Sequence, residues 1–270
     1  DLAVVVDSVE AAQAVAAKGA GIPALVEIDC DGHRAGVKPG HPVLLDIAKA
    51  LARGARPAGV MTHAGDSYNC RTTQAIADMA ERERGAVVKS AAVLRSGGFA
   101  CPVVSVGSTP TATFARSLEG VTEVRAGVFV FHDLVMAGLG VCRVEDIAVS
   151  VLCTVIGHQR EKGWVITDGG WMATSRDRGT AKQAVDQGYG LVCDEAGRAL
   201  GDLVVTDANQ EHGIVGRRDG QPFDVAQYPV GTRLRILPNH ACATAAQHDA
   251  YHVVRGGTEV VARWPRFGGW

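Results

Sequence analysis

The chain has 270 residues and a formal net charge of −2, with 27 Lys and Arg against 29 Asp and Glu. A nearly neutral chain is not typical of proteins that bind nucleic acids or anionic membranes, because both depend on clusters of Lys and Arg. The hydrophobic content of 47% and the charged content of 21% exclude intrinsic disorder. No apolar run reaches the length of about 18 residues that a membrane-spanning helix needs.

The seven cysteines indicate a reducing environment. They are scattered, odd in number and never spaced as Cys-x-x-Cys, so they do not form the disulfide framework of a small secreted protein. We therefore predict a cytoplasmic protein.

The first half of the chain alternates between two patterns. Short apolar runs rich in Val and Ile predict strands, and amphipathic segments between them predict helices. The predicted strands are residues 2–6, 24–30, 59–62, 101–106 and 123–131, and the predicted helices are residues 9–18, 43–53, 73–95 and 111–118. Strands separated by helices indicate βα units that build a parallel sheet.

The second half reads as a β-domain. Strand-like runs follow one another with Gly, Asp and Pro turns between them and no strong helical segment. These runs are residues 147–155, 164–167, 190–193, 203–205, 213–215 and 233–237. Such a pattern is typical of an antiparallel sheet. We place the boundary near residue 140 and predict domains at 1–140 and 141–270.

Polar loops follow three predicted strands in the first half. They lie at residues 31–34, 63–68 and 107–111, where parallel α/β proteins form their binding sites. One such loop alone is more often an ordinary capped turn, but three in series favour a site. The loop that begins at Gly107 suits an anion, since glycine permits a close backbone approach and Ser108 precedes a helix start. Gly127, inside a strand pattern, marks either a ligand approach or a bulge.

His240 and Cys242 form a candidate metal site. Residues two apart project to one side of an extended segment, and an imidazole with a thiolate suits zinc or a similar transition metal. Two protein ligands would leave room for substrate and water. The alternative is a buried thiol beside a surface histidine, and a rival zinc site would add His248 and His252. The polar segment 209–213 is either a site loop or a hairpin turn.

Six segments together resemble one group of pyridoxal-phosphate enzymes, the D-serine dehydratases and D-threonine aldolases with an alanine-racemase-type barrel. The resemblance runs through the whole chain in order. The segments are Val26-Glu27-Ile28-Asp29 with Asp31-Gly32-His33-Arg34, Thr62-His63-Ala64-Gly65 to Tyr68, Val104-Ser105-Val106-Gly107-Ser108-Thr109-Pro110-Thr111, Glu123-Val124-Arg125-Ala126-Gly127 to Asp133, Asn209-Gln210-Glu211-His212-Gly213, and Pro238-Asn239-His240-Ala241-Cys242.

The resemblance implies a fold and a set of site residues. The fold is part of a (β/α)8 TIM-type barrel of fold type III, followed by an antiparallel β-domain that carries the metal site. The pyridoxal 5′-phosphate site implied is Thr109, Gly127 and Val128 at the phosphate, with Arg34 and Tyr68 near the cofactor. His240 and Cys242 are the implied ligands of a divalent metal, with zinc first and manganese, magnesium or cobalt as alternatives. We expect the two sets to share one cavity.

The resemblance also implies a reaction. We predict a lyase that removes water from a D-configured β-hydroxy amino acid, such as D-threo-3-hydroxyaspartate or D-serine, to give an oxo acid and ammonia. The aldolases of the group have Asp where Cys242 stands here, which favours the dehydratase over the alternative aldolase. The expected partners are a small D-amino acid substrate and a second copy in a homodimer, with no nucleic acid and no membrane.

One departure concerns the lysine that binds the cofactor in this group. The basic segment that carries it on the first barrel strand has no counterpart, and the six lysines of the chain fall in helix or loop segments: Lys18, Lys38, Lys49, Lys89, Lys162 and Lys182. We therefore expect a fragment that begins at the fourth barrel strand and is inactive by itself. A non-catalytic protein that binds the cofactor is the remaining alternative.

Overall fold

Parallel strands form the first sheet, as the alternating pattern predicts. In the computed structural model, which describes residues 2–268, this sheet belongs to the first of two units, Asp1–Gly127, and the second unit is Val128–Trp270. The strand order is β1-β2-β3-β4-β5, and every neighbouring pair is parallel. The strands are β1 (Val4–Val6), β2 (Pro23–Ile28), β3 (Arg56–Thr62), β4 (Val103–Val106) and β5 (Glu123–Val124). The predicted βα alternation is confirmed.

Four helices connect these strands, and polar side chains cap three of them. They are α1 (Val9–Lys18), α2 (Val43–Leu51), α3 (Thr73–Ser96) and α4 (Thr109–Phe114). Ser8 caps α1 through its hydroxyl, and Thr72 and Ser108 cap α3 and α4 in the same way. Each hydroxyl accepts a hydrogen bond from a backbone N–H that has no partner inside its helix.

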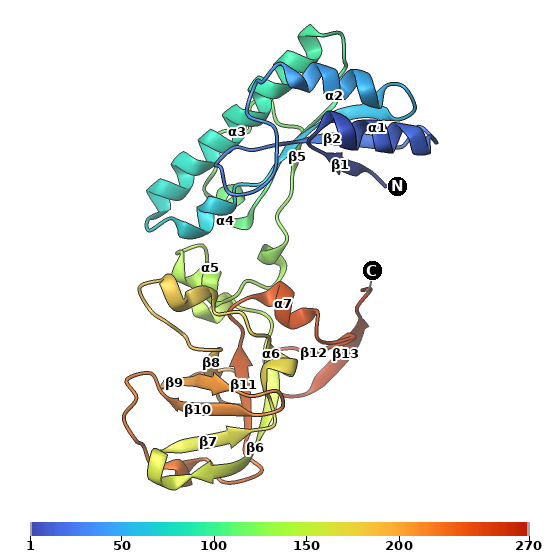
Figure 1. Ribbon diagram of the computed structural model, residues 1–270. Helices are drawn as coiled ribbons and strands as arrows, with labels where there is room; N and C mark the ends of the chain where they lie inside the picture. The colour runs from blue at the N-terminus through green and yellow to red at the C-terminus, as the bar shows by residue number, and fades with distance from the viewer. Residues whose placement is uncertain (1, 269–270) are drawn as a thin grey trace. The chain divides into compact units, whose positions relative to one another are not determined.

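The core of this unit lies between the sheet and its helices. Side chains of β2 alternate in burial, so that Ala24, Val26 and Ile28 are buried while Leu25 and Glu27 are only partly covered. The buried set packs against Leu44, Ile47 and other apolar side chains of the helices. Figure 1 shows α1, α2 and α3 running along the sheet. A parallel sheet with crossover helices is the arrangement expected for part of a (β/α)8 barrel.

Six antiparallel strands close into a barrel in the second unit, in the order β10-β7-β6-β11-β8-β9. They are β6 (Val151–Gln159), β7 (Trp164–Thr167), β8 (Leu191–Cys193), β9 (Ala199–Ala208), β10 (Gly213–Arg217) and β11 (Arg233–Leu237). Val155, Val165 and Leu234 are among the buried side chains of its core. The expected antiparallel β-domain is confirmed.

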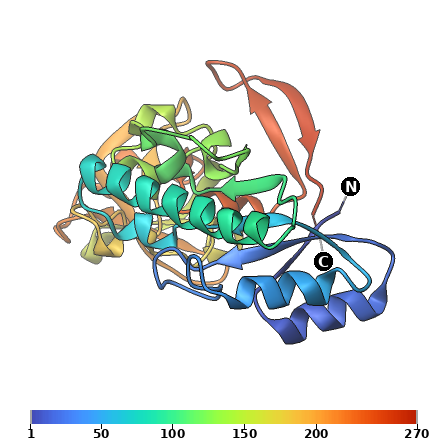
Figure 2. The ribbon, with the colours of Figure 1, turned by 90° about the horizontal axis from the view of Figure 1, so that it is seen from above.

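Short helices and a separate hairpin complete the second unit. The helices are α5 (Leu134–Gly138), α6 (Trp171–Thr174) and α7 (Ala241–Ala245), and the hairpin joins β12 (Ala250–Val254) to β13 (Val260–Pro265). Figure 2 shows this hairpin as a long two-stranded ribbon. This hairpin is not among the strands predicted from the sequence.

The predicted strand at residues 123–131 is wrong beyond Val124. β5 ends there, and Val128–Val130 forms a turn of 3-10 helix. The N–H groups of Phe131 and His132 both donate to the Val128 carbonyl, at 3.1 and 2.7 Å. The β-branched residues that suggest a strand therefore lie in a turn, where local backbone bonds replace pairing with a neighbour.

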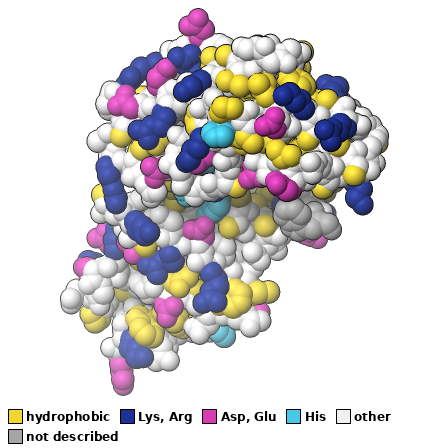
Figure 3. All heavy atoms as spheres, turned by 45° about the horizontal axis from the view of Figure 1, so that its top comes forward, with side chains coloured by type: hydrophobic (Ala, Val, Ile, Leu, Met, Phe, Trp, Pro, Cys, Tyr) yellow, Lys and Arg dark blue, Asp and Glu magenta, His cyan; other side chains and the backbone are white. Residues whose placement is uncertain are grey.

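The surface agrees with the near-zero net charge. Figure 3 shows Lys and Arg interspersed with Asp and Glu on the face it presents, without a large region of one sign. Within residues 2–268, no helix is both long enough and apolar enough to cross a membrane.

Candidate functional site

The predicted cofactor residues follow the carboxyl ends of neighbouring strands. Arg34 lies in the loop after β2, Tyr68 in the 3-10 helix Gly65–Asn69 after β3, and Thr109 at the start of α4 after β4. Gly127 and Val128 come shortly after β5. Because β2 to β5 are adjacent and parallel, the loops after them emerge at one edge of the sheet.

The loop after β2 is held by charged side chains. Arg34 donates to the Glu27 carboxylate at 2.8 Å, and about half of the Arg34 side chain is exposed. Asp29 accepts hydrogen bonds from the Gly32 N–H at 2.6 Å and from Lys38 Nζ at 2.5 Å. Burial raises the pKa of Asp29, but the bonds from Lys38 and Gly32 lower it by more, so its pKa lies below the ordinary value.

The loop after β3 contacts the loop after β4 through His63. Its Nδ1 lies 2.5 Å from the Gly107 carbonyl oxygen, so Nδ1 carries the proton and donates it. Burial lowers the pKa of His63, which favours the neutral ring with Nε2 unprotonated. The centroid of the Tyr68 ring lies 6.4 Å from the centroid of the His63 ring.

Gly107 and Ser108 are constrained by the protein itself. A Cβ added at Gly107 would lie 2.2 Å from the Arg125 carbonyl oxygen, so only glycine fits without a shift of the backbone. Ser108 Oγ accepts the Thr111 N–H at 3.3 Å and lies 3.2 Å from Ser67 Oγ. The helix-cap interpretation is therefore confirmed for Ser108, and α4 is only six residues long.

Gly127 has open space beside its backbone. It lies after β5 rather than inside a strand, and a Cβ added to it would meet no protein atom within 4 Å. Packing within the protein does not demand glycine here, in contrast to Gly107. The open space beside its backbone fits an anion such as the cofactor phosphate.

His240 and Cys242 lie at the start of α7. His240 occupies the cap position in an extended conformation, and Cys242 follows in the first turn with an exposed side chain. The alternative of a buried thiol is therefore wrong. His240 Nδ1 lies 2.8 Å from Asp177 Oδ2. Hydrogen bonds to Asp177 and Cys242 raise the pKa of His240 to about 10.

The backbone on both sides of His240 is fixed by buried polar groups. Asn239 donates to the carbonyl oxygens of Asp177 and Gly188, at 3.0 and 2.7 Å. The buried Asp133 accepts the Ala241 N–H at 2.9 Å. These bonds fix the backbone from which the imidazole and the thiol project.

The donor set fits a metal ion with two protein ligands. Asp177 occupies Nδ1 of His240, so a metal would bind at Nε2 in place of the proton that this nitrogen carries at neutral pH. Such carboxylate–histidine pairs commonly orient metal ligands. In the part of the chain that the structure describes, no group of three or more His, Cys, Asp and Glu could hold a metal. The rival site is wrong, since His248 Nε2 contacts the Ala173 carbonyl at 2.9 Å and His252 lies on β12.

The polar segment 209–213 is a hairpin turn. It joins β9 to β10, with the Asn209 N–H donating to the His212 carbonyl at 2.8 Å. The carbonyl oxygens of Asn209 and Gln210 accept the first N–H groups of α6, from Trp171 and Met172. A hairpin turn is thus the conformation of this segment.

Sequence reasoning missed Asp177 and Glu83. Asp177 lies among Arg, Gly and Thr, with no spacing that links it to a histidine 63 positions later. Glu83 stands in the charged run Glu81-Arg82-Glu83-Arg84 and is nevertheless buried. Neither residue gives a local signal, because long-range packing creates both roles.

Two family models match the chain. The alanine racemase N-terminal domain matches residues 1–134, and the putative serine dehydratase domain matches residues 148–254. Two curated relatives extend these matches. D-threo-3-hydroxyaspartate dehydratase of Delftia sp. is 56% identical over all of this chain and 73% of its own length. D-serine dehydratase of Dictyostelium discoideum is 30% identical over 87% of this chain and 62% of its own length.

Solved structures similar to this chain include a dehydratase and an aldolase that act on D-amino acids. The Delftia enzyme superposes with a TM-score of 0.94 at 56% identity, over 100% of this chain and 73% of that one. D-threonine aldolase of Filomicrobium marinum has a TM-score of 0.76 at 25% identity, over 97% of this chain and 68% of that one. Two mutants of the same dehydratase replace a histidine and a cysteine that are two positions apart, and the cysteine mutant is in a metal-free form.

These matches support the pyridoxal-phosphate fold type III architecture that the sequence predicts. The spacing of the two mutated residues in that dehydratase equals the spacing of His240 and Cys242. One relative is 56% identical over all of this chain, and both family models match. The chain therefore belongs to the D-serine dehydratase family, whose N-terminal domain is of the alanine racemase type.

Proposed function

We propose that this protein is a lyase that dehydrates a D-configured β-hydroxy amino acid, using pyridoxal 5′-phosphate and a divalent metal. The substrate is D-threo-3-hydroxyaspartate or D-serine, and the products are an oxo acid and ammonia. The observation that carries this proposal is the His240–Cys242 pair, with the imidazole held by Asp177 at 2.8 Å. The dehydratases of Delftia and Dictyostelium among its relatives support the substrate class.

The proposal assigns the cofactor to the edge of the parallel sheet. Thr109, Gly127 and Val128 would hold its phosphate, with Arg34 and Tyr68 near the rest of the cofactor. The open space at Gly127 supports this assignment. When bound, the cofactor withdraws electrons from the substrate Cα, and the metal polarises the β-hydroxyl so that it leaves more easily.

The side chains around the metal pair have separate tasks. His240 and Cys242 would bind the metal through a nitrogen and a sulfur. Asp177 keeps Nδ1 of His240 engaged and so directs Nε2 toward the metal. Asp133 and Asn239 hold the backbone on either side of His240. Two protein ligands leave coordination positions for the substrate hydroxyl and water.

Cys242 also favours the dehydratase over the aldolase. A D-threonine aldolase of Arthrobacter sp. is 30% identical over 92% of this chain, so the same scaffold serves both reactions. Product analysis of the full-length protein separates them. We expect D-threo-3-hydroxyaspartate to yield ammonia and an oxo acid, and formation of glycine and an aldehyde would establish the aldolase instead.

Three further features belong to the proposal. We assign zinc to the metal site, because imidazole and thiolate ligands favour it, and metal analysis of the purified protein tests this. We assign a homodimer, which light scattering tests. All seven cysteines are free thiols, which supports the assignment to the cytoplasm.

A further inference from the structure

A buried carboxylate lies beneath the proposed cofactor loops. Glu83, in the middle of α3, is only 2% exposed, and the reaction proposed above does not use it. Burial raises the pKa of Glu83, and hydrogen bonds from Thr111, Gly107 and Ala64 offset part of that rise. A buried carboxylate is costly unless it accepts hydrogen bonds. The identity of its partners therefore indicates what it does.

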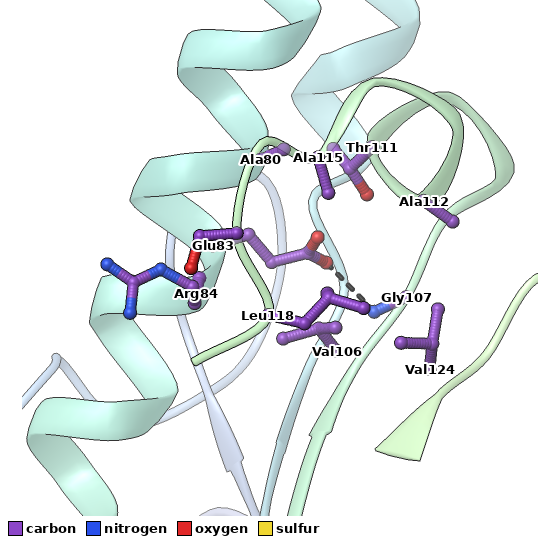
Figure 4. A pocket seen from close by; sticks show the side chains of 11 residues that line it. Ala80, Glu83, Arg84, Val106, Gly107, Thr111, Ala112, Ala115, Leu118 and Val124 are labelled. Atoms are coloured by element: carbon purple, nitrogen blue, oxygen red, sulfur yellow. Dashed lines mark hydrogen bonds between the residues drawn. The ribbon is translucent and has the colours of Figure 1, made fainter. Parts of the chain in front are cut away.

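One oxygen atom of Glu83 joins two loops. Oε1 accepts the Ala64 N–H at 3.0 Å and the Gly107 N–H at 3.0 Å. Ala64 precedes the 3-10 helix that contains Tyr68, and Gly107 comes two residues before Thr109. Figure 4 shows Glu83 reaching from α3 to Gly107, with Thr111 beside it. The loops after β3 and β4 are thus fixed to the same acceptor.

Gly107 is held on three sides. Its N–H donates to Glu83, its carbonyl accepts from His63 Nδ1 at 2.5 Å, and the Arg125 carbonyl blocks the position of a Cβ. These contacts leave its two peptide groups a single orientation. The direction of the chain into Ser108 and Thr109 follows from that orientation.

We propose that Glu83 is the positioning residue for the cofactor phosphate, because it holds the loops after β3 and β4 in the arrangement that binds the anion. This inference rests on the proposed function. A hydrocarbon side chain at position 83 would leave two buried N–H groups without an acceptor. The loops would then adopt other conformations, and the groups that meet the phosphate would lose their alignment.

The test compares pyridoxal 5′-phosphate with pyridoxal, which lacks the phosphate, as ligands of the full-length protein. We expect Glu83→Leu to weaken binding of the phosphorylated cofactor by about tenfold or more, and binding of pyridoxal by less than about twofold. We expect Glu83→Gln, which keeps an acceptor oxygen, to restore most of the preference. Ser90→Ala is the matched control, since Ser90 is also buried in α3 and accepts a loop N–H, that of Gly40 at 3.1 Å.

The ratio of the two affinities decides between a positioning role and a merely structural one. A folded Glu83→Leu protein with the wild-type ratio would overturn the inference. If that variant fails to fold, Glu83→Asp decides, because its shorter side chain cannot reach both amides. A reduced ratio in Glu83→Asp supports the inference, and an unchanged ratio overturns it. A wild-type protein without preference for the phosphate would instead overturn the proposed cofactor site, and the inference with it.

Discussion

The two units hold their candidate binding groups in place in different ways. In residues 1–127, the candidate cofactor residues lie in loops after parallel strands, and the buried side chain of Glu83 accepts hydrogen bonds from the backbone of two of those loops. In residues 128–270, the candidate ligands are the side chains of His240 and Cys242, and Asp177 fixes one of them directly. The first arrangement depends on the path of the loop backbone, whereas a side-chain site depends on the identity of each ligand.

The largest effect is expected at the side-chain site. Replacing Cys242 by Ala removes one of two protein ligands, and we expect metal affinity to fall by at least about 100-fold. Measurement of bound metal in the dialysed full-length protein checks this. Cys142→Ala is the control, because that thiol is half-buried and burial raises its pKa to about 11. Stoichiometric metal in the Cys242 variant would contradict the assignment.

A smaller loss of metal affinity is expected when Asp177 is changed. We expect Asp177→Asn to lower metal affinity by about 10- to 100-fold, because the amide no longer fixes the imidazole as a carboxylate does. Competition with a chelator of known affinity measures the change. The affinity of the protein for pyridoxal 5′-phosphate should stay the same. Unchanged metal affinity would show that His240 needs no orienting partner.

Substitutions at two glycines of the first unit should affect different properties, cofactor affinity at Gly127 and stability at Gly107. At Gly127 an added Cβ meets no protein atom within 4 Å, so Gly127→Ala should leave the free energy of unfolding unchanged and weaken pyridoxal 5′-phosphate binding by about tenfold. At Gly107 the added Cβ lies 2.2 Å from a backbone oxygen, so Gly107→Ala should lower the free energy of unfolding by about 1–3 kcal/mol. Urea unfolding and cofactor titration of both variants check the pair. Loss of stability in the Gly127 variant would refute the open-space interpretation.

The smallest effect concerns the loop after β2. The pKa of Asp29 is lower in the folded chain than its ordinary value, so its contribution to stability is present above about pH 4 and is lost as pH falls through the folded pKa. We expect Asp29→Asn to lower the free energy of unfolding by less than about 1.5 kcal/mol at pH 7 and to flatten its dependence on pH below 4. Acid unfolding curves of the two proteins check this, and parallel curves would disprove it.

The fold was largely predictable because local patterns specify it. Helix 9–18, β7 and β11 have the predicted bounds. The strand predicted at 123–131 fails beyond Val124 because the β-branched residues Val128 and Val130 look the same in a turn as in a strand. Nothing in the local sequence shows that the N–H groups of Phe131 and His132 donate to the Val128 carbonyl and not to a neighbouring strand.

The candidate site was predictable only in part. His240 and Cys242 are visible because their chemistry is unusual at that spacing. Glu83 and Asp177 are invisible because their neighbours are charged or polar residues typical of a solvated surface, and their partners are 19 to 63 positions away. The residues that hold a site therefore require the folded chain, although some residues that form it can be read from the sequence.

The reaction proposed for this protein requires a metal held by His240 and Cys242. The most direct measurement is ammonia release from D-threo-3-hydroxyaspartate by the full-length protein before and after its metal is removed, with the absorption of the bound cofactor followed in parallel. We predict that ammonia release falls to background while the cofactor stays bound, and that added metal restores the rate. An unchanged rate in the metal-free protein would contradict the account.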